Sequence, residues 1–343
     1  MKDGLTRRME IPDTFRAVRF HRTGNPLDVL SVDDLPFREL KADEVRIRVA
    51  AFALNRADWL FCRGEHYSLP QLPSRIGSEC AGTVMEVGSE VDPALVGRKV
   101  FTVPFHNADY GVQGEFATVP QNFIAPWPSE LSAVEAAASW MQYLTAYFPL
   151  IAIGNVGPAD FVLVPAASSS AGLAAVQIAK LRGAHVIATS RSSRKAGEIA
   201  AAGADTVLAM DEPASLAERI HRVTVGRGVR IVFDPVAGPF LGEYLDALAD
   251  DARIFIYGLL SGEKTELDIV RLVRHAAIVH PYSMFNHVRH SHGLSAAIAF
   301  VKQAIRNGLR PRIDRVFRMG DVMAAYRRLD SHQQIGKIVV SDE

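Results

Sequence analysis

The segment that most restricts the fold of this chain runs from about residue 133 to residue 281, where short apolar runs alternate with helix-length stretches. Strand-like runs occur at 160–164, 185–188, 206–209, 229–233, 253–257 and 277–279. Helical patterns occur at 168–181, 194–202, 215–224, 238–249 and 266–275. Strands that alternate with helices are typical of βαβ units. The sequence therefore predicts an α/β Rossmann domain, a doubly wound parallel sheet with helices on its faces.

The segments on either side of this region have a different pattern. Residues 44–52 alternate polar and apolar side chains, which is the period of a half-buried strand, and 80–87 and 99–103 resemble further short strands. Near the other end, 292–307 has an amphipathic helical pattern and 336–340 resembles a last strand. We expect a β-rich domain built from both ends of the chain, residues 1–138 and 286–343, with the α/β domain at 139–285 between them.

Composition excludes several classes of function. The chain has 343 residues, and its 38 Lys and Arg balance 38 Asp and Glu, so it has no net charge to attract nucleic acid or an anionic membrane. Its start lacks the apolar core of a signal peptide, and no apolar stretch reaches the roughly 20 residues of a membrane span. The two cysteines, Cys62 and Cys80, form no C-x-x-C pair. We expect a cytoplasmic protein without nucleic-acid or membrane partners.

Residues 160–180 are the most informative stretch for function. An apolar strand leads into seven small residues, 166–172, and then into an amphipathic helix. Small side chains let a pyrophosphate approach the backbone, and the exposed N–H groups and helix dipole stabilise its charge. The G-x-G-x-x-G fingerprint is incomplete, because Ala167, Ser169 and Gly172 stand at its three glycine positions. A close-packed strand–helix turn without a ligand is the alternative. The expected cofactor contacts are Ser168, Ser169, Ser170, Ala171, Gly172 and Leu173.

The end of the next predicted strand indicates which dinucleotide would bind. NAD-specific folds place an acidic residue there, to bind the ribose hydroxyls. This chain has Ser190, Arg191, Arg194 and Lys195, and no acid. A carboxylate would repel a 2′-phosphate, whereas arginine and serine can bind it. The pattern predicts NADP(H), with Arg191 as the first phosphate partner and Lys195 and Ser190 next; a solvated basic loop is the alternative.

Several stretches occur in the order typical of one family: 55–58 (NRAD), 77–84, 141–147, 166–180, 203–205, 233–238 and 336–340. With them the chain resembles the zinc-independent, quinone-oxidoreductase-like branch of the medium-chain dehydrogenase/reductase superfamily. The resemblance implies a GroES-like catalytic domain beside the Rossmann domain, and a homodimer joined at the Rossmann sheet edge near 257–272. The family's turn is usually A-x-x-G-x-x-G. Here Ser169 replaces the middle glycine, which costs stability only where φ is positive.

The positions that hold zinc in related dehydrogenases differ in this chain. Those relatives have a cysteine where this chain has Asn55, and a histidine where it has Ser78. Neither amide nor hydroxyl is a good zinc ligand. Cys80 is expected to be a small buried residue, and His66, His106 and the histidines of 275–292 lack a ligand spacing. We therefore expect no metal.

Without a metal, the oxygen of a small electrophilic substrate needs a hydrogen-bond donor. The candidate catalytic residues are Asn55, Tyr67, Gln142 and Tyr143, each with a packing role as the alternative. A tyrosine that some relatives have two positions after N-x-x-D is Leu60 here. The resemblance adds further cofactor contacts: Thr145, Val236, Tyr257, Gly258, Phe285 and Lys337.

Three functions remain open on the sequence. The first is an NADPH-dependent oxidoreductase that reduces quinones or α,β-unsaturated carbonyls by hydride transfer. The second is an enoyl-thioester reductase that acts on acyl-CoA or carrier-bound chains. The third, from another class, is an NADPH-binding sensor or structural protein with little turnover.

Overall fold

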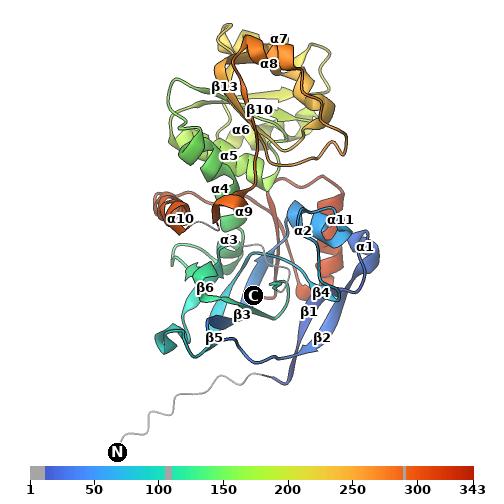
Figure 1. Cartoon of the computed structure of the whole chain (residues 1–343), viewed down its shortest axis with the longest axis vertical. Coiled ribbons are helices and arrows are strands. Elements are labelled where there is room, and N and C mark those ends of the chain that lie inside the picture. Colours follow the sequence, from blue (N-terminus) through green and yellow to red (C-terminus); the bar gives the residue numbers. More distant parts are fainter. Residues whose placement is uncertain (1–11, 105–109, 289–290) are drawn as a thin grey trace, which may run out of the picture. The chain divides into compact units, whose positions relative to one another are not determined.

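The computed structural model describes residues 12–104, 110–288 and 291–343. Two compact units form: unit 1 comprises Met1–Trp140, Arg315–Gln333 and Ile338–Glu343, and unit 2 comprises Met141–Asp314 and Gln334–Lys337. Figure 1 shows both units with the labels used below. The first boundary lies two residues beyond the expected one. Helix α10 (Ser291–Arg306), expected in the β-rich domain, belongs to unit 2, where Phe300 packs on Tyr147.

The sheet of unit 2 has six strands in the order β11-β10-β9-β12-β13-β14. Every neighbouring pair is parallel. The chain order reverses between β9 and β12, so the sheet has the switch point at which doubly wound folds bind ligands. The Rossmann prediction is confirmed. The strands are β9 (Phe161–Val164), β10 (His185–Ser190), β11 (Thr206–Ala209), β12 (Val229–Asp234), β13 (Leu248–Ile256) and β14 (Ile278–Pro281).

Helices follow the strands of unit 2 much as the sequence pattern predicts. α5 turns its small apolar side chains inward, among them Ala174, Ala175 and Ala179, so that it packs closely on β9 and β10. Besides α10, the helices of unit 2 are α4 (Trp140–Tyr147, continued as the π-helical turn η3, Phe148–Ile153), α5 (Ser170–Leu181), α6 (Ala196–Ala201), α7 (Leu216–Thr224), α8 (Ile269–Arg274) and α9 (Met284–Val288). A short 3-10 turn, η4 (Ser193–Lys195), precedes α6.

The predicted helix at 238–249 is wrong. Two 3-10 turns, η5 (Gly238–Glu243) and η6 (Leu245–Ala247), lead directly into β13. The backbone enters this region with positive φ at Ala237 and Gly238, and the Tyr244 hydroxyl donates to the buried Asp234. Leu241, Tyr244 and Leu245 are spaced like one face of a helix, but their burial in the core is achieved by a tighter turn.

Unit 1 is β-rich, as predicted. β3 (Glu44–Ala53) is central to its larger sheet and pairs antiparallel with β5, β7 and β16. Because β16 comes from the last residues of the chain, both chain ends build this sheet. The strands other than β3 are β1 (Thr14–Phe20), β2 (Leu30–Pro36), β4 (Ser74–Arg75), β5 (Cys80–Val87), β6 (Lys99–Thr102), β7 (Phe116–Pro120), β8 (Ile124–Pro126), β15 (Ile313–Phe317) and β16 (Lys337–Ser341).

Short helices and turns cover the strands of unit 1. α2 and α11 pack into its apolar core, where Trp59 of α2 lies against Tyr326 of α11. These elements are α1 (Pro26–Val29), α2 (Arg56–Arg63), α3 (Ala133–Ala137) and α11 (Val322–Asp330), with 3-10 turns η1 (Pro93–Leu95), η2 (Gln121–Phe123) and η7 (Met319–Asp321). Among the described residues, no helix is long and apolar enough to cross a membrane.

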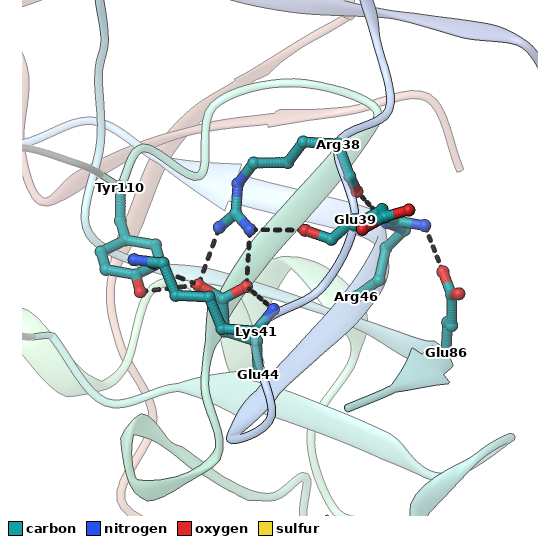
Figure 2. Close-up of polar contacts among 7 residues, drawn as sticks. All are labelled: Arg38, Glu39, Lys41, Glu44, Arg46, Glu86 and Tyr110. Carbon is teal, nitrogen blue, oxygen red and sulfur yellow. Dashed lines mark hydrogen bonds and ion pairs between the residues drawn. The ribbon is translucent and has the colours of Figure 1, made fainter. Parts of the chain in front are cut away.

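A buried carboxylate anchors the start of β3 (Figure 2). Glu44 accepts hydrogen bonds from the Arg38 guanidinium at 2.7 and 2.8 Å, from the Lys41 backbone N–H at 2.9 Å and from the Tyr110 hydroxyl at 2.7 Å. Burial alone would raise the pKa of Glu44, but these hydrogen bonds lower it to about 2. Beside it, Arg46 forms an ion pair with Glu86.

Candidate functional site

The turn between β9 and α5 has the backbone that close contact with an anion needs. Ser169 has φ −69 and ψ 158, so the serine that replaces a family glycine is unstrained. The positive φ of the turn falls instead on Ala166, at 48°, at a cost of about 1 kcal/mol. Gly172 has no room for a side chain in this geometry, because a Cβ there would lie 2.7 Å from Ala167 Cα.

Ser169 is also the N-cap of α5. Its Oγ accepts a hydrogen bond from the Gly172 N–H at 3.0 Å. Serine is among the preferred N-cap residues, because its oxygen satisfies one of the unpaired N–H groups of the first turn. Ser170 and Ala171 begin the helix, with their N–H groups at its positive end.

Two more segments of unit 2 meet this turn. Lys195 Nζ lies 3.4 Å from Ser168 Oγ and donates to the Gln334 carbonyl at 2.9 Å. Ser168 O accepts from the Gly336 N–H at 2.9 Å, and Ser169 forms a parallel bridge with Gly336. The predicted phosphate turn and basic strand end therefore lie together.

Ser190 and Arg191 lie at that strand end with different exposure. Ser190, the last residue of β10, is buried, whereas Arg191 is exposed.

Gln334 was not predicted, because no sequence motif marks it. Its Oε1 is buried, and no described residue donates a hydrogen bond to it.

The ends of β12 and β13 hold Val236, Tyr257 and Gly258. Asp234 supports them: its buried carboxylate accepts from the Val236 N–H at 2.6 Å and from the Tyr244 hydroxyl at 2.8 Å. Burial raises the pKa of Asp234, and these hydrogen bonds oppose the rise. A Cβ on Gly258 would lie 2.8 Å from Pro235 O, so the two strand ends approach closely.

The ring of Tyr257 stacks on Phe233 at 4.0 Å between centroids. Its hydroxyl oxygen is buried, and no described group meets hydrogen-bond geometry with it. Burial and the Asp234 charge raise the pKa of Tyr257, whereas the Ser169 hydroxyl lowers it. Tyr257 therefore lies within the electrostatic reach of the phosphate turn.

α4 positions the other candidates of unit 2. Gln142 is buried, and its Oε1 has no hydrogen-bond donor among the described residues. Thr145, three residues on and so on the same face, donates its hydroxyl to the Met141 carbonyl at 2.5 Å. Tyr143 is fully buried and donates to Gln177 Oε1 at 3.0 Å, which argues against a catalytic role for its hydroxyl.

Phe285 and Lys337, two of the expected cofactor contacts, are both buried. Lys337 directly follows the Gly336 contact with the phosphate turn, and its own N–H donates to the Arg312 carbonyl at 2.8 Å. This is a backbone attachment of the segment 334–337 to the rest of unit 2.

In unit 1, Asn55 belongs to a buried polar network. Its Nδ2 donates to Glu79 Oε1 at 3.1 Å, and its N–H donates to Asp58 Oδ2 at 2.9 Å. Gln113 Nε2 also donates to Asp58, at 3.2 Å, and Tyr326 OH donates to Gln113 Oε1 at 2.7 Å. The N-x-x-D spacing could have indicated the Asp58 contact, but Gln113 and Tyr326 are too distant in sequence to be found.

Tyr67 is the other catalytic candidate of unit 1. Its side chain is 59% exposed, and its ring centroid lies 4.1 Å from that of His66. Leu69 and Leu72 of the same loop are exposed as well. The loop therefore presents an aromatic and two aliphatic side chains to solvent.

Asn55 and Ser78 stand at the positions where the family resemblance implies that zinc ligands are replaced. Ser78 Oγ is buried without a hydrogen-bond partner among the described residues, and Asn55 is bonded to Glu79. Cys80 is buried as expected, and burial raises the pKa of its thiol, like that of Cys62, to about 12. The described part of the chain contains no group of three or more His, Cys, Asp or Glu that could hold a metal. His106 and His290 lie outside the described residues.

Comparisons with known proteins agree with this arrangement. The alcohol dehydrogenase GroES-like domain family matches residues 41–129, and the zinc-binding dehydrogenase family matches residues 171–303. The quinone oxidoreductase of Salmonella typhimurium is 31% identical over 252 residues, which cover 74% of this chain and 75% of that protein. The chain belongs to the quinone oxidoreductase family of the medium-chain dehydrogenases/reductases.

Solved structures of similar proteins have the same fold. Escherichia coli quinone oxidoreductase complexed with NADPH has a TM-score of 0.85 and 27% identity, and the match covers 95% of this chain and 99% of that one. The CurF ER cyclopropanase from the curacin A biosynthetic pathway has a TM-score of 0.84 and 27% identity, covering 96% and 99%. These matches confirm the GroES-like and Rossmann domains that the sequence predicts.

Proposed function

We propose that this chain is an NADPH-dependent oxidoreductase that reduces quinones or α,β-unsaturated carbonyls. The observation that carries the proposal is the acid-free end of β10, which holds Ser190 and Arg191 and is followed by Lys195, whose Nζ lies 3.4 Å from Ser168 Oγ of the phosphate turn. Family membership and the NADPH complex of the Escherichia coli relative support the same cofactor.

The residues present fit NADPH. The N-terminus of α5 offers N–H groups and dipole to the pyrophosphate, and Ser190, Arg191 and Lys195 offer hydrogen bonds and charge to the 2′-phosphate. Gln142 Oε1 and Gln334 Oε1 are buried acceptors without donors among the described residues, a state that costs about 1–3 kcal/mol each. An amide N–H such as that of the nicotinamide would satisfy an acceptor of this kind. Thr145, Val236, Tyr257, Gly258, Phe285 and Lys337 are proposed as further contacts.

NADPH, when bound, supplies the hydride; the chain supplies orientation and hydrogen bonds. We assign the substrate oxygen to donors of unit 1. Glu79 fixes the orientation of the Asn55 amide within a buried network, and Tyr67 presents an exposed phenol beside apolar Leu69 and Leu72. Because Asn55 and Ser78 replace the usual ligands, the proposed mechanism uses no zinc.

The likeness to the CurF enzyme supports a second candidate, an enoyl-thioester reductase. Purified protein should oxidise NADPH with a simple benzoquinone faster than with crotonyl-CoA, as measured by the loss of NADPH absorbance. The reverse order would favour the enoyl-thioester reductase. Quenching of intrinsic fluorescence by NADPH without turnover on either substrate would instead favour an NADPH-binding sensor.

The cofactor preference has its own test. Arg191→Asp should weaken NADPH binding roughly 10- to 100-fold and NADH binding little, because one charge-assisted hydrogen bond to the 2′-phosphate contributes about 1.5–3 kcal/mol. Arg194→Asp, an exposed arginine of the same loop, is the matched control. Equal losses of NADPH and NADH affinity in Arg191→Asp would contradict NADP preference.

We also propose a cytoplasmic homodimer. β14 is the last strand of its sheet, so one of its edges has no strand partner in the described chain. Exposed apolar side chains also occur on β14 itself, on α8 and in the loop after β13: Leu259, Leu260, Ile269, Val270, Val273 and Ile278. A second copy of the same edge would cover both the backbone groups and this apolar surface.

A further inference from the structure

We propose that the Ser169 hydroxyl is a built-in cap of α5 that the cofactor pyrophosphate displaces, and that Tyr257 receives this hydroxyl when it leaves. The inference rests on the proposed NADPH-binding function. It concerns the position where this chain departs from the usual family turn, which has a glycine in place of Ser169.

The first observation is the use of the Gly172 N–H. This group is one of the unpaired donors of the first turn of α5, the donors that an anion at a helix N-terminus takes. In this chain Ser169 Oγ already accepts from it at 3.0 Å. A glycine at 169 would leave the same N–H without a side-chain partner, so the serine competes with a phosphate oxygen for one donor.

The second observation is that only the side chain needs to move. The Ser169 N–H donates to the Ala166 carbonyl at 3.0 Å, the Ser169 carbonyl accepts from the Leu173 N–H at 2.9 Å, and Gly336 pairs with Ser169 on the other side. These bonds hold the backbone on both sides of the residue. A serine hydroxyl turns about a single bond, and it can donate as well as accept.

The third observation is the buried Tyr257 hydroxyl, for which no described group meets hydrogen-bond geometry. The Ser169 hydroxyl lowers the pKa of Tyr257, although the pair does not meet hydrogen-bond geometry in this structure. A buried polar group without a partner is costly. Once displaced from Gly172, the Ser169 O–H can donate to the Tyr257 oxygen, which offsets part of the loss of the cap.

The exchange makes cofactor binding weaker than it would be in a glycine turn, and release correspondingly easier. Replacing a serine cap by glycine typically changes an equilibrium only roughly 1.5- to twofold. We therefore expect Ser169→Gly to tighten NADPH binding roughly 1.5- to twofold. In the cofactor-free Ser169→Gly protein, the Gly172 amide hydrogen should exchange with solvent faster than it does in the cofactor-free wild type.

The test measures NADPH dissociation constants by titration calorimetry and amide exchange by mass spectrometry or NMR. Variants are Ser169→Gly, Tyr257→Phe and the double variant. Tyr257→Phe should weaken NADPH binding severalfold in the Ser169 protein and have little effect in the Ser169→Gly protein. Ser215→Gly is the matched control, since Ser215 Oγ caps α7 by accepting from the Glu218 N–H at 3.3 Å. That variant should lose stability without changing NADPH affinity.

Two results would overturn the exchange: unchanged or weaker NADPH binding in Ser169→Gly, or unchanged Gly172 exchange in that variant. Equal effects of Tyr257→Phe in both backgrounds would overturn the part assigned to Tyr257. A wild-type protein that does not bind NADPH would overturn the proposed function instead. The cap is then judged by Gly172 exchange and by whether Ser169→Gly binds inorganic pyrophosphate more tightly than the wild type.

Discussion

Single residues of this chain acquire their properties from partners at very different sequence distances. The basic end of β10 can be predicted from the sequence because Ser190 ends a recognisable strand, and Arg191 and Lys195 follow within five residues. Glu44 is different. Its nearest partners, Arg38 and Lys41, are local, but Tyr110 comes from a distant segment, and complete burial follows only from folding. The depressed pKa of Glu44 was therefore beyond sequence reasoning.

The Glu44 carboxylate predicts a specific acid sensitivity. Its pKa falls from an ordinary value of 4.5 to about 2 in the folded protein. A depressed pKa contributes stability that is complete above pH 4.5 and is lost as the pH falls toward 2. The contribution is on the order of 3 kcal/mol. Urea unfolding from pH 5 down to about pH 2 should show this loss in the wild type and a smaller one in Glu44→Gln.

Glu115→Gln is the control for that measurement, because Glu115 forms a solvent-exposed pair with Arg16. Exposed pairs contribute little, so this variant should follow the wild-type pH profile. A Glu44→Gln profile parallel to that of the wild type would mean that Glu44 is not the group whose protonation destabilises unit 1.

At the scale of elements, hydrophobic periodicity was a good guide where burial and geometry agree. β5 and β11 have the bounds that the sequence predicts, because each is a short run of mostly apolar residues. The 238–249 segment has a helical spacing of apolar residues but folds as 3-10 turns, since Asp234 and the positive φ of Ala237 and Gly238 direct the chain. Spacing alone does not separate these outcomes.

Two glycines of unit 2 should respond oppositely to alanine. Gly172→Ala places a Cβ 2.7 Å from Ala167 Cα, so α5 must move away from the turn that follows β9; we expect a loss of about 1–3 kcal/mol in stability and weaker NADPH binding. Gly197→Ala in α6 meets no atom within 4 Å and should stabilise by about 0.5–1 kcal/mol. Thermal unfolding measures both. A neutral Gly172→Ala would mean that the strand–helix contact is looser than described.

At the scale of the whole molecule, the proposed dimer depends on the apolar side chains that a single chain exposes. Val270 and Val273 are 65% and 71% exposed on α8, the helix that precedes the edge strand β14 in the chain. Replacing both by glutamate should convert the dimer to a monomer, because charge would have to be buried without a partner. Sedimentation velocity measures the change. Val225→Lys, at a valine that is 87% exposed on α7's C-terminal side, should leave the dimer intact. A wild-type monomer at micromolar concentration would contradict the proposal.

The sequence by itself determined the two-domain architecture, the parallel sheet and the acid-free strand end, because each depends on the order and period of neighbouring residues. Tertiary structure alone decided which polar groups are already hydrogen-bonded within the protein and which can bind a cofactor or substrate. It brought Gln334 and Gly336 to the phosphate turn, used the Tyr143 hydroxyl on Gln177, and exposed Tyr67. Hydrogen bonds between residues far apart in the chain have no sequence period, so only the folded chain shows which donors and acceptors are already paired.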